Sequence, residues 1–228
     1  MFIDPLWIIL VAPTLLLSLW AQHKVKSTFE KYSKVASRKR ISGQDSAALL
    51  LRAKNIRDVQ IEPVSGTLTD HYDPRSKRVR LSQPVFGENS IAAIGVAAHE
   101  AGHAIQHATG YGPLVLRSTL VPVANIGSRA GPFIALAGLF FYYSMPQLFY
   151  LGILLFAGAV LFYLITLPVE FDASARAIAI LRENNVLTNE ELVGVRRVLT
   201  AAAMTYVASA LTAVMSLVRL ILMSRNRR

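Results

Sequence analysis

The chain has 228 residues, enough for one compact domain, but 53% of them are hydrophobic, which is too apolar for an ordinary soluble globule and predicts that part of the chain lies in lipid. It contains no cysteine, so disulfides, thiolate zinc sites and cysteine nucleophiles are excluded. The net charge of +10 comes without an RNP, zinc-finger or helix-turn-helix signature, so we attribute it to membrane topology and expect no nucleic-acid partner.

The first apolar segment, residues 5–21 (PLWIILVAPTLLLSLWA), is about as long as a helix must be to span a bilayer. Only Asp4 is charged before it, so the positive n-region of a cleaved signal peptide is missing. We therefore expect an uncleaved anchor. The stretch 22–40, dense in Lys and Arg, belongs on the cytoplasmic side by the positive-inside rule, which turns the N-terminus outward.

The next part of the chain is predicted to be a small cytoplasmic unit. Residues 42–55 (SGQDSAALLLRAKN) have the pattern of an amphipathic helix with a capping box. The stretches 66–73 and 77–82 alternate around turn residues, which predicts a β-hairpin. A helix that Ser90 can cap then runs to about Gly110.

That helix carries the histidines of AAHEAGHAIQHATGY, residues 97–111. Residues four apart share a helix face, so His99 and His103 can turn imidazole nitrogens onto one ion, with Glu100 placed to take a proton from water. This is the HExxH pattern of zinc peptidases. His107 lies about 12 Å beyond His99 at ~1.5 Å per residue, so we interpret it as a surface histidine or a hydrogen-bond partner, not a ligand.

Two long apolar stretches, residues 119–143 and 147–167, are separated only by SMPQ and predict a transmembrane hairpin. A last apolar run, 199–223, predicts a fourth crossing. Arg219 and the basic tail would then lie outside, against the positive-inside rule, so the orientation of this span is left open.

A catalytic zinc needs a third protein ligand, and in a chain without cysteine the remaining candidates are acids. Glu170 is the best of them, because the predicted hairpin returns it to the membrane face that holds the histidine helix. Alternatively, it only favours the dipole of a helix that begins after Pro168. Asp172 could accept a hydrogen bond from a ligating imidazole, or could be an exposed carboxylate at the same helix start.

With HEAGHAIQH, the hairpin ending in RVRLS, and LPVEFDASARA in view, the chain resembles the YugP-type membrane zinc metallopeptidases, distant relatives of the HtpX and CaaX-prenyl-protease group. The resemblance runs from about Lys24 to Arg219. It implies a gluzincin, with one Zn²⁺ per chain on the two HExxH histidines and Glu170, and Glu100 as general base. The HtpX-like pattern has an aspartate four residues after the ligand glutamate, where this chain has Ser174.

The resemblance also suggests a substrate-binding edge, because main-chain pairing holds an extended peptide without demanding a particular sequence. The alternative is that the strand only covers the active-site helix. An oxyanion formed during hydrolysis needs a hydrogen-bond donor, for which Tyr206 is a candidate, with a packing role as the alternative. The expected edge strand comprises Arg78, Val79, Arg80, Leu81 and Ser82.

We therefore expect a mostly α membrane protein with about four transmembrane helices and a small α+β, zincin-like cytoplasmic unit that contains the hairpin and the HExxH helix. The expected function is a multi-pass zinc endopeptidase of the cell membrane, facing the cytoplasm and acting on protein or peptide substrates, with its oligomeric state unassigned. A site-2-type intramembrane protease and a non-enzymatic scaffold with a structural metal are the alternatives. The expected parts are the anchor (1–22), the cytoplasmic metallopeptidase unit (23–118), the membrane hairpin (119–168), the helix with the third ligand (169–198), and the last span with its basic tail (199–228).

Overall fold

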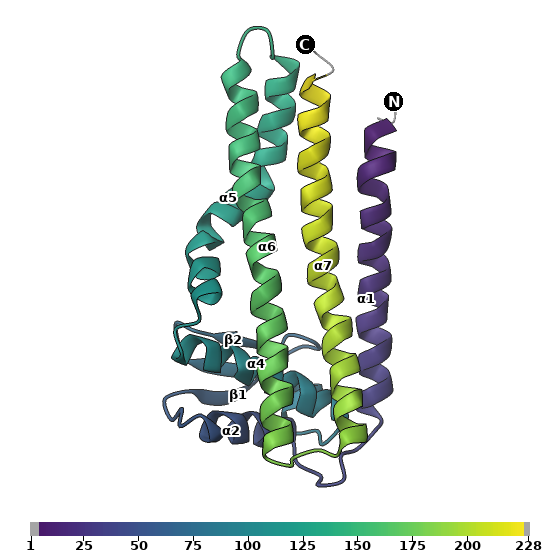
Figure 1. The fold of residues 1–228 in the computed structure, drawn as a ribbon, viewed down its shortest axis with the longest axis vertical. Helices are drawn as coiled ribbons and strands as arrows, with labels where there is room; N and C mark the ends of the chain where they lie inside the picture. Colours follow the sequence, from purple (N-terminus) through teal and green to yellow (C-terminus); the bar gives the residue numbers. More distant parts are fainter. Residues whose placement is uncertain (1–4, 226–228) are drawn as a thin grey trace. The chain divides into compact units, whose positions relative to one another are not determined.

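The computed structural model describes residues 5–225, and helices dominate this part of the chain (Figure 1). Its strands are β1 (Gln60–Val64), β2 (His71–Asp73) and β3 (Arg78–Ser82). Its helices are η1 (Trp7–Val11), α1 (Ala12–Ser33), α2 (Gly43–Ala53), α3 (Gln83–Phe86), α4 (Ile91–Ala108), α5 (Gly112–Phe140), α6 (Pro146–Glu183) and α7 (Asn189–Arg225).

Four of the described helices are long and apolar enough to cross a membrane: η1 with α1, α5, α6 and α7. This confirms the expected mostly helical protein with about four membrane-length helices and a small sheet. The chain folds as two compact units. The membrane unit comprises Met1–Gln22, Val115–Leu167 and Met204–Arg228, and the sheet unit comprises His23–Leu114 and Pro168–Ala203.

In the membrane unit, glycines allow α5 and α6 to pack closely. A Cβ atom at Gly138 would overlap the backbone of Phe149, and one at Gly152 would overlap the backbone of Ala135. Such contacts between small residues hold membrane helices together where no hydrophobic driving force acts between them. Leu220 of α7 lies in one buried apolar cluster with Ala135 of α5 and Phe149 of α6. The C-terminal end of α7 lies at the same end of the unit as the α5–α6 turn (Figure 1).

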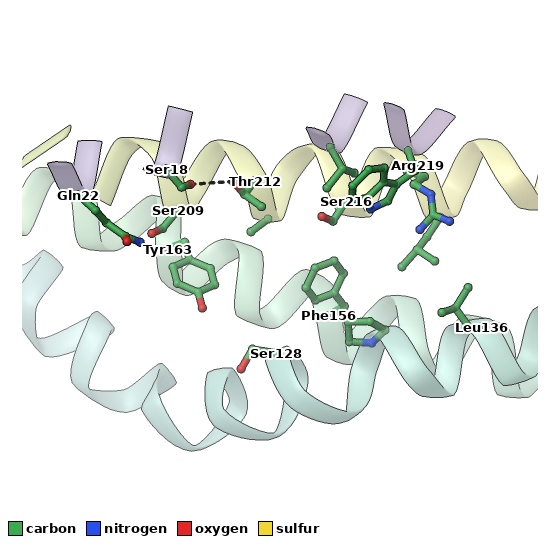
Figure 2. Close-up of a pocket in the computed structure, with 15 residues that line it drawn as sticks. Ser18, Gln22, Ser128, Leu136, Phe156, Tyr163, Ser209, Thr212, Ser216 and Arg219 are labelled. Carbon is green, nitrogen blue, oxygen red and sulfur yellow. Dashed lines mark hydrogen bonds between the residues drawn. The ribbon is translucent and has the colours of Figure 1, made fainter. Parts of the chain in front are cut away.

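A cavity of about 450 Å³ lies among α1, α5, α6 and α7 within the membrane unit (Figure 2). Its lining includes the hydroxyl side chains of Ser128 on α5 and Tyr163 on α6. The hydroxyl oxygens of Ser18 on α1 and Thr212 on α7 lie 3.5 Å apart beside it. Polar groups on membrane helices turn toward the bundle interior because contact with lipid tails would leave them unsatisfied.

The sheet unit is built on a three-stranded sheet in the order β1-β3-β2. β2 and β3 are antiparallel, as the predicted hairpin requires, and β1 is parallel to β3. β3 is therefore the central strand, and the prediction that it forms a free edge is wrong. The last residue of β3, Ser82, also donates its backbone N–H to the Asp70 carboxylate at 2.7 Å. The strand wrongly predicted as an edge comprises Arg78, Val79, Arg80, Leu81 and Ser82.

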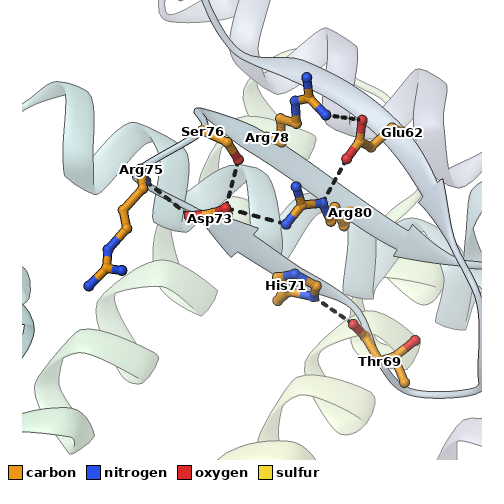
Figure 3. Close-up of polar contacts among 8 residues, drawn as sticks. All are labelled: Glu62, Thr69, His71, Asp73, Arg75, Ser76, Arg78 and Arg80. Carbon is orange, nitrogen blue, oxygen red and sulfur yellow. Dashed lines mark hydrogen bonds and ion pairs between the residues drawn. The ribbon is translucent and has the colours of Figure 1, made fainter. Parts of the chain in front are cut away.

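One face of this sheet carries ion pairs that join all three strands (Figure 3). The Glu62 carboxylate accepts from Arg78 at 3.0 Å and from Arg80 at 2.7 Å, and Arg80 also pairs with Asp73 at 3.3 Å. A hydrogen bond from the Ser76 hydroxyl, with further backbone donors, holds the pKa of Asp73 at about 2. The other face supplies Val79 and Leu81 to the core of the unit, where α4 also packs.

Candidate metal centre

The three side chains predicted to bind a metal converge within the sheet unit. His99 and His103 lie one turn apart on α4, and Glu170 comes from α6. Glu170 Oε2 lies 3.2 Å from His99 Nε2 and 3.5 Å from His103 Nε2, and the three candidate donor atoms all lie within 4.8 Å of one another. Tetrahedral zinc with bonds of ~2.0–2.1 Å separates its donor atoms by about 3.3 Å, so two imidazole nitrogens and one carboxylate oxygen at these spacings suit zinc.

A glycine of the HEAGH sequence allows α4 and α6 to meet at this point. A Cβ atom at Gly102 would lie 2.6 Å from the backbone oxygen of Ala173, closer than real Cβ atoms approach backbone. Since Ala173 lies three residues after Glu170, this contact sets the distance at which the carboxylate meets the imidazoles. The same pentapeptide therefore supplies both candidate histidine ligands and the space for the helix that carries the third candidate, Glu170.

The site is nearly closed to solvent and favours a cation. The side chains of Glu170, His103 and His99 are 3%, 11% and 14% exposed. Burial lowers the pKa of His103, but the hydrogen bond to Glu170 and the charges of Glu100 and Glu170 outweigh it and raise the pKa above its ordinary value. A buried carboxylate is stable only when paired, and here the imidazoles of His99 and His103 are its partners.

Each of the two candidate imidazole ligands has a hydrogen-bond partner on its second nitrogen. His99 Nδ1 lies 3.0 Å from the Ser174 hydroxyl, and His103 Nδ1 lies 3.0 Å from the side-chain oxygen of Gln106. Sequence reasoning did not assign either partner. Their spacings offered a signal, since Gln106 lies three residues after His103 and Ser174 lies four residues after Glu170, each on the same helix face as its neighbour.

Asp172 takes neither of its two predicted roles. It accepts from the Gln106 amide at 2.8 Å and from Arg176 at 2.5 Å, so it reaches His103 only through Gln106. It is not at a helix start either, because α6 continues through Pro168 without a break. Membrane helices tolerate an internal proline because neighbouring groups satisfy the freed backbone carbonyl.

Glu100 follows the first ligand on α4 and is 9% exposed. Within residues 5–225 its carboxylate forms no hydrogen bond, and it is not in the group of side chains that could hold the metal. A carboxylate beside a metal with both oxygens available can accept a proton from water. Tyr206 belongs to the membrane unit, and its suggested role as an oxyanion donor stays a prediction.

His107, one turn beyond His103, connects the helix to the sheet. Its Nδ1 lies 2.8 Å from the hydroxyl of Tyr72 on β2. Burial, together with the charges of Asp58 and Asp73, raises the pKa of Tyr72 to about 12, so the phenol stays protonated. This contact holds β2, an outer strand of the sheet, against α4, the helix that carries the two candidate histidine ligands.

Two histidines one helical turn apart and a glutamate from a second helix form the ligand set of zinc peptidases. The chain belongs to the family described as "Putative neutral zinc metallopeptidase", whose model matches residues 7–225. The chain is also 49% identical over 223 residues to the "Putative membrane protease YugP" of Bacillus subtilis (strain 168), and the matched region covers 98% of each chain. The resemblance to YugP-type proteins is thus confirmed. No solved structure matches the chain significantly.

Proposed function

We propose that the protein is an integral membrane zinc endopeptidase in which Glu100 is the general base. The observation that carries this proposal is the convergence of His99, His103 and Glu170, with donor spacings that suit zinc. The family description and the name of the Bacillus relative support the same activity.

When bound, zinc lowers the pKa of water and polarises the scissile carbonyl. His99, His103 and Glu170 would hold it with three protein donors, which would leave a position for the reactants. The Glu100 carboxylate removes the proton from the attacking water and passes it to the leaving amine. The low exposure of the ligands keeps bulk water away and strengthens the electrostatic interactions at the reacting atoms.

Two observations favour this function over its alternatives. A structural zinc would use four protein donors, whereas the candidate group within residues 5–225 has three. A site-2-type protease would carry HExxH on a membrane-spanning helix, whereas α4 is not among the described helices that could span a membrane. These observations support peptide hydrolysis over a structural metal site, and they support an HExxH helix that does not itself span the membrane.

We assign the substrate-pairing edge to β2. Within residues 5–225, β2 pairs with β3 alone, so its other side is available to an extended peptide. The Tyr72–His107 hydrogen bond keeps this strand against α4, and a peptide paired with β2 would lie along the helix that holds two metal ligands. Such pairing suits protein substrates of varied sequence.

We place the protein in the cell membrane, with the metal centre facing the cytoplasm. The basis is the lysine- and arginine-rich stretch 22–40, which follows the first span. The α5–α6 turn and the C-terminal end of α7 would then face outward.

The function is tested by purifying the wild type and Glu100→Gln in detergent and measuring zinc per chain and cleavage of unfolded casein, with and without a chelator. We expect about one zinc per chain in both proteins and chelator-sensitive cleavage in the wild type. The variant should lose activity by at least ~100-fold, because the proton acceptor is gone. Glu88→Gln, at an exposed glutamate that precedes α4, is the matched control and should cleave normally. A wild type without zinc, or an active Glu100→Gln, would contradict the proposal.

A further inference from the structure

We propose that Ser174 and Gln106 are positioning residues that fix both ligand imidazoles with Nε2 toward the metal, and that their lack of charge tunes how tightly the metal is held. This inference rests on the proposed zinc site and deepens it. It concerns the hydrogen bonds at the Nδ1 atoms of His99 and His103, on the far side of each ring from Glu170.

The contacts of Gln106 determine the tautomer of His103. Its amide nitrogen lies 2.8 Å from the backbone oxygen of Val169 and 2.8 Å from the Asp172 carboxylate, and both of these groups accept hydrogen bonds. The NH2 group must therefore face them, which turns the amide oxygen toward His103 Nδ1. Because that oxygen only accepts, Nδ1 must carry the proton, and Nε2 is left as the nitrogen that binds a metal.

Gln106 is held firmly in this orientation. Its side chain is fully buried, with 0% exposure, and bonds to α6 at two points. Asp172 is anchored in turn by Arg176 at 2.5 Å. An amide with three well-placed partners in a closed site cannot flip without leaving several polar groups unsatisfied.

Ser174 places a hydroxyl against His99 Nδ1 from the other helix, and this hydroxyl would accept the Nδ1 proton when Nε2 binds the metal. It lies one turn after Glu170 on α6, so a single helix face presents both a ligand and the hydroxyl that orients another ligand. The close approach of α6 to Gly102 brings both side chains to α4 at once. A shift of α6 would therefore disturb two of the three ligands together.

Both partners are uncharged, and this affects the metal. A carboxylate hydrogen-bonded to a ligand imidazole increases the basicity of the ring and the affinity for zinc. The acid that contacts Gln106, Asp172, is separated from His103 by the Gln106 side chain, and its charge is balanced by Arg176. The metal is then bound less tightly than with carboxylate partners and keeps more of its positive charge for the substrate carbonyl.

The test measures the zinc dissociation constant of the full chain in detergent, by competition with a chromophoric chelator. Ser174→Ala should weaken zinc binding by about 10- to 100-fold. Ser174→Asp should restore or exceed the wild-type affinity, which a purely packing role for Ser174 would not produce. Gln106→Met, which removes the acceptor for His103, should weaken binding to a similar extent. Ser33→Ala is the matched control, since Ser33 is a part-buried helical serine that bonds only to its own helix.

The outcomes separate this inference from the proposed function. If the wild type binds zinc and Ser174→Ala binds it equally tightly, the positioning role is wrong and the endopeptidase proposal stands. If Ser174→Asp binds as weakly as Ser174→Ala, the hydroxyl does not act as an acceptor. If the wild type binds no zinc, both proposals fail. Should Gln106→Met not fold, the three serine variants still decide the matter.

Discussion

Glu170 completes the metal centre with a side chain that is only 3% exposed. Burying a carboxylate without a cation costs free energy. A metal ion that binds only the folded protein adds to the free energy of unfolding. The metal should therefore hold α6 against α4 as well as serve catalysis.

Removal of zinc should lower the thermal stability of the protein. With free zinc at 100 times its dissociation constant, the expected contribution is about 2.7 kcal/mol. Glu170→Ala should bind no zinc, and its melting temperature should not respond to a chelator. The measurement is thermal unfolding of both proteins with and without chelator. A wild type whose melting temperature ignores the chelator would refute this prediction.

Gly102→Ala should destabilise the protein, because the added Cβ would lie 2.6 Å from the backbone oxygen of Ala173. The helices must then move apart, at a cost of about 1–3 kcal/mol. Zinc affinity should fall too, since Glu170 moves with α6. Gly87→Ala is the control, because a Cβ atom there meets nothing within 4 Å. Equal stability of the two variants, measured by thermal unfolding, would argue against the close helix contact.

Residue spacing alone was enough to predict His99 and His103, because helix geometry places them on one face. Glu170 could be predicted by following the chain through its membrane crossings. Ser174 could not be predicted as the partner of His99, because that hydrogen bond depends on how closely α4 and α6 approach, whereas Gln106 lies three residues after His103 on the same helix. The distance between α4 and α6 is set at Gly102, and the sequence around this glycine does not reveal which helix packs against it.

At the scale of elements, the hairpin of β2 and β3 was visible in the sequence, whereas the position of β3 within the sheet was not. β1 (QIEPV) contains a proline and is parallel to β3, a pairing that no local turn signal reveals. Because β1 pairs with one side of β3 and β2 with the other, the outer strands of the sheet are β1 and β2. The prediction that a new helix begins after Pro168 was also wrong, because α6 continues through this proline. Prolines end helices in soluble proteins more often than in membrane proteins.

If β2 binds the substrate, loosening it from α4 should impair binding more than chemistry. Tyr72→Phe removes the hydroxyl that lies 2.8 Å from His107 and keeps the ring. We expect KM for a peptide substrate to rise several-fold, by the ~1 kcal/mol of one hydrogen bond, with kcat little changed. Steady-state kinetics of this variant beside Tyr32→Phe, whose hydroxyl contacts Arg197 away from β2, provide the check. A fall in kcat at constant KM would point to a catalytic role for Tyr72 instead.

At the scale of the whole molecule, four membrane-length helices and a small sheet unit agree with what composition and apolar runs predicted. The orientation of the last span could not be derived, since its basic residues oppose the positive-inside rule. Within the membrane unit, α7 reaches the end where α5 and α6 turn, so both places should lie on one side of the membrane.

The absence of native cysteines makes this orientation directly measurable. In intact cells, a membrane-impermeant maleimide should label Ser144→Cys in the α5–α6 turn and Ser224→Cys near the end of α7. Ser65→Cys, after β1 in the sheet unit, should be labelled only after the cells are opened. Labelling of Ser65→Cys in intact cells would reverse the proposed orientation, and opposite results for the other two variants would contradict the packing of α7.

The distribution of ligands between α4 and α6 also bears on biosynthesis. Glu170 is synthesised 71 residues after His99, and α5 and most of α6 lie between them. A ribosome-bound chain that has released only α4 carries two ligands of three and a site that cannot yet hold zinc firmly. The candidate metal site can therefore be completed only after α5, and α6 as far as Glu170, have been made.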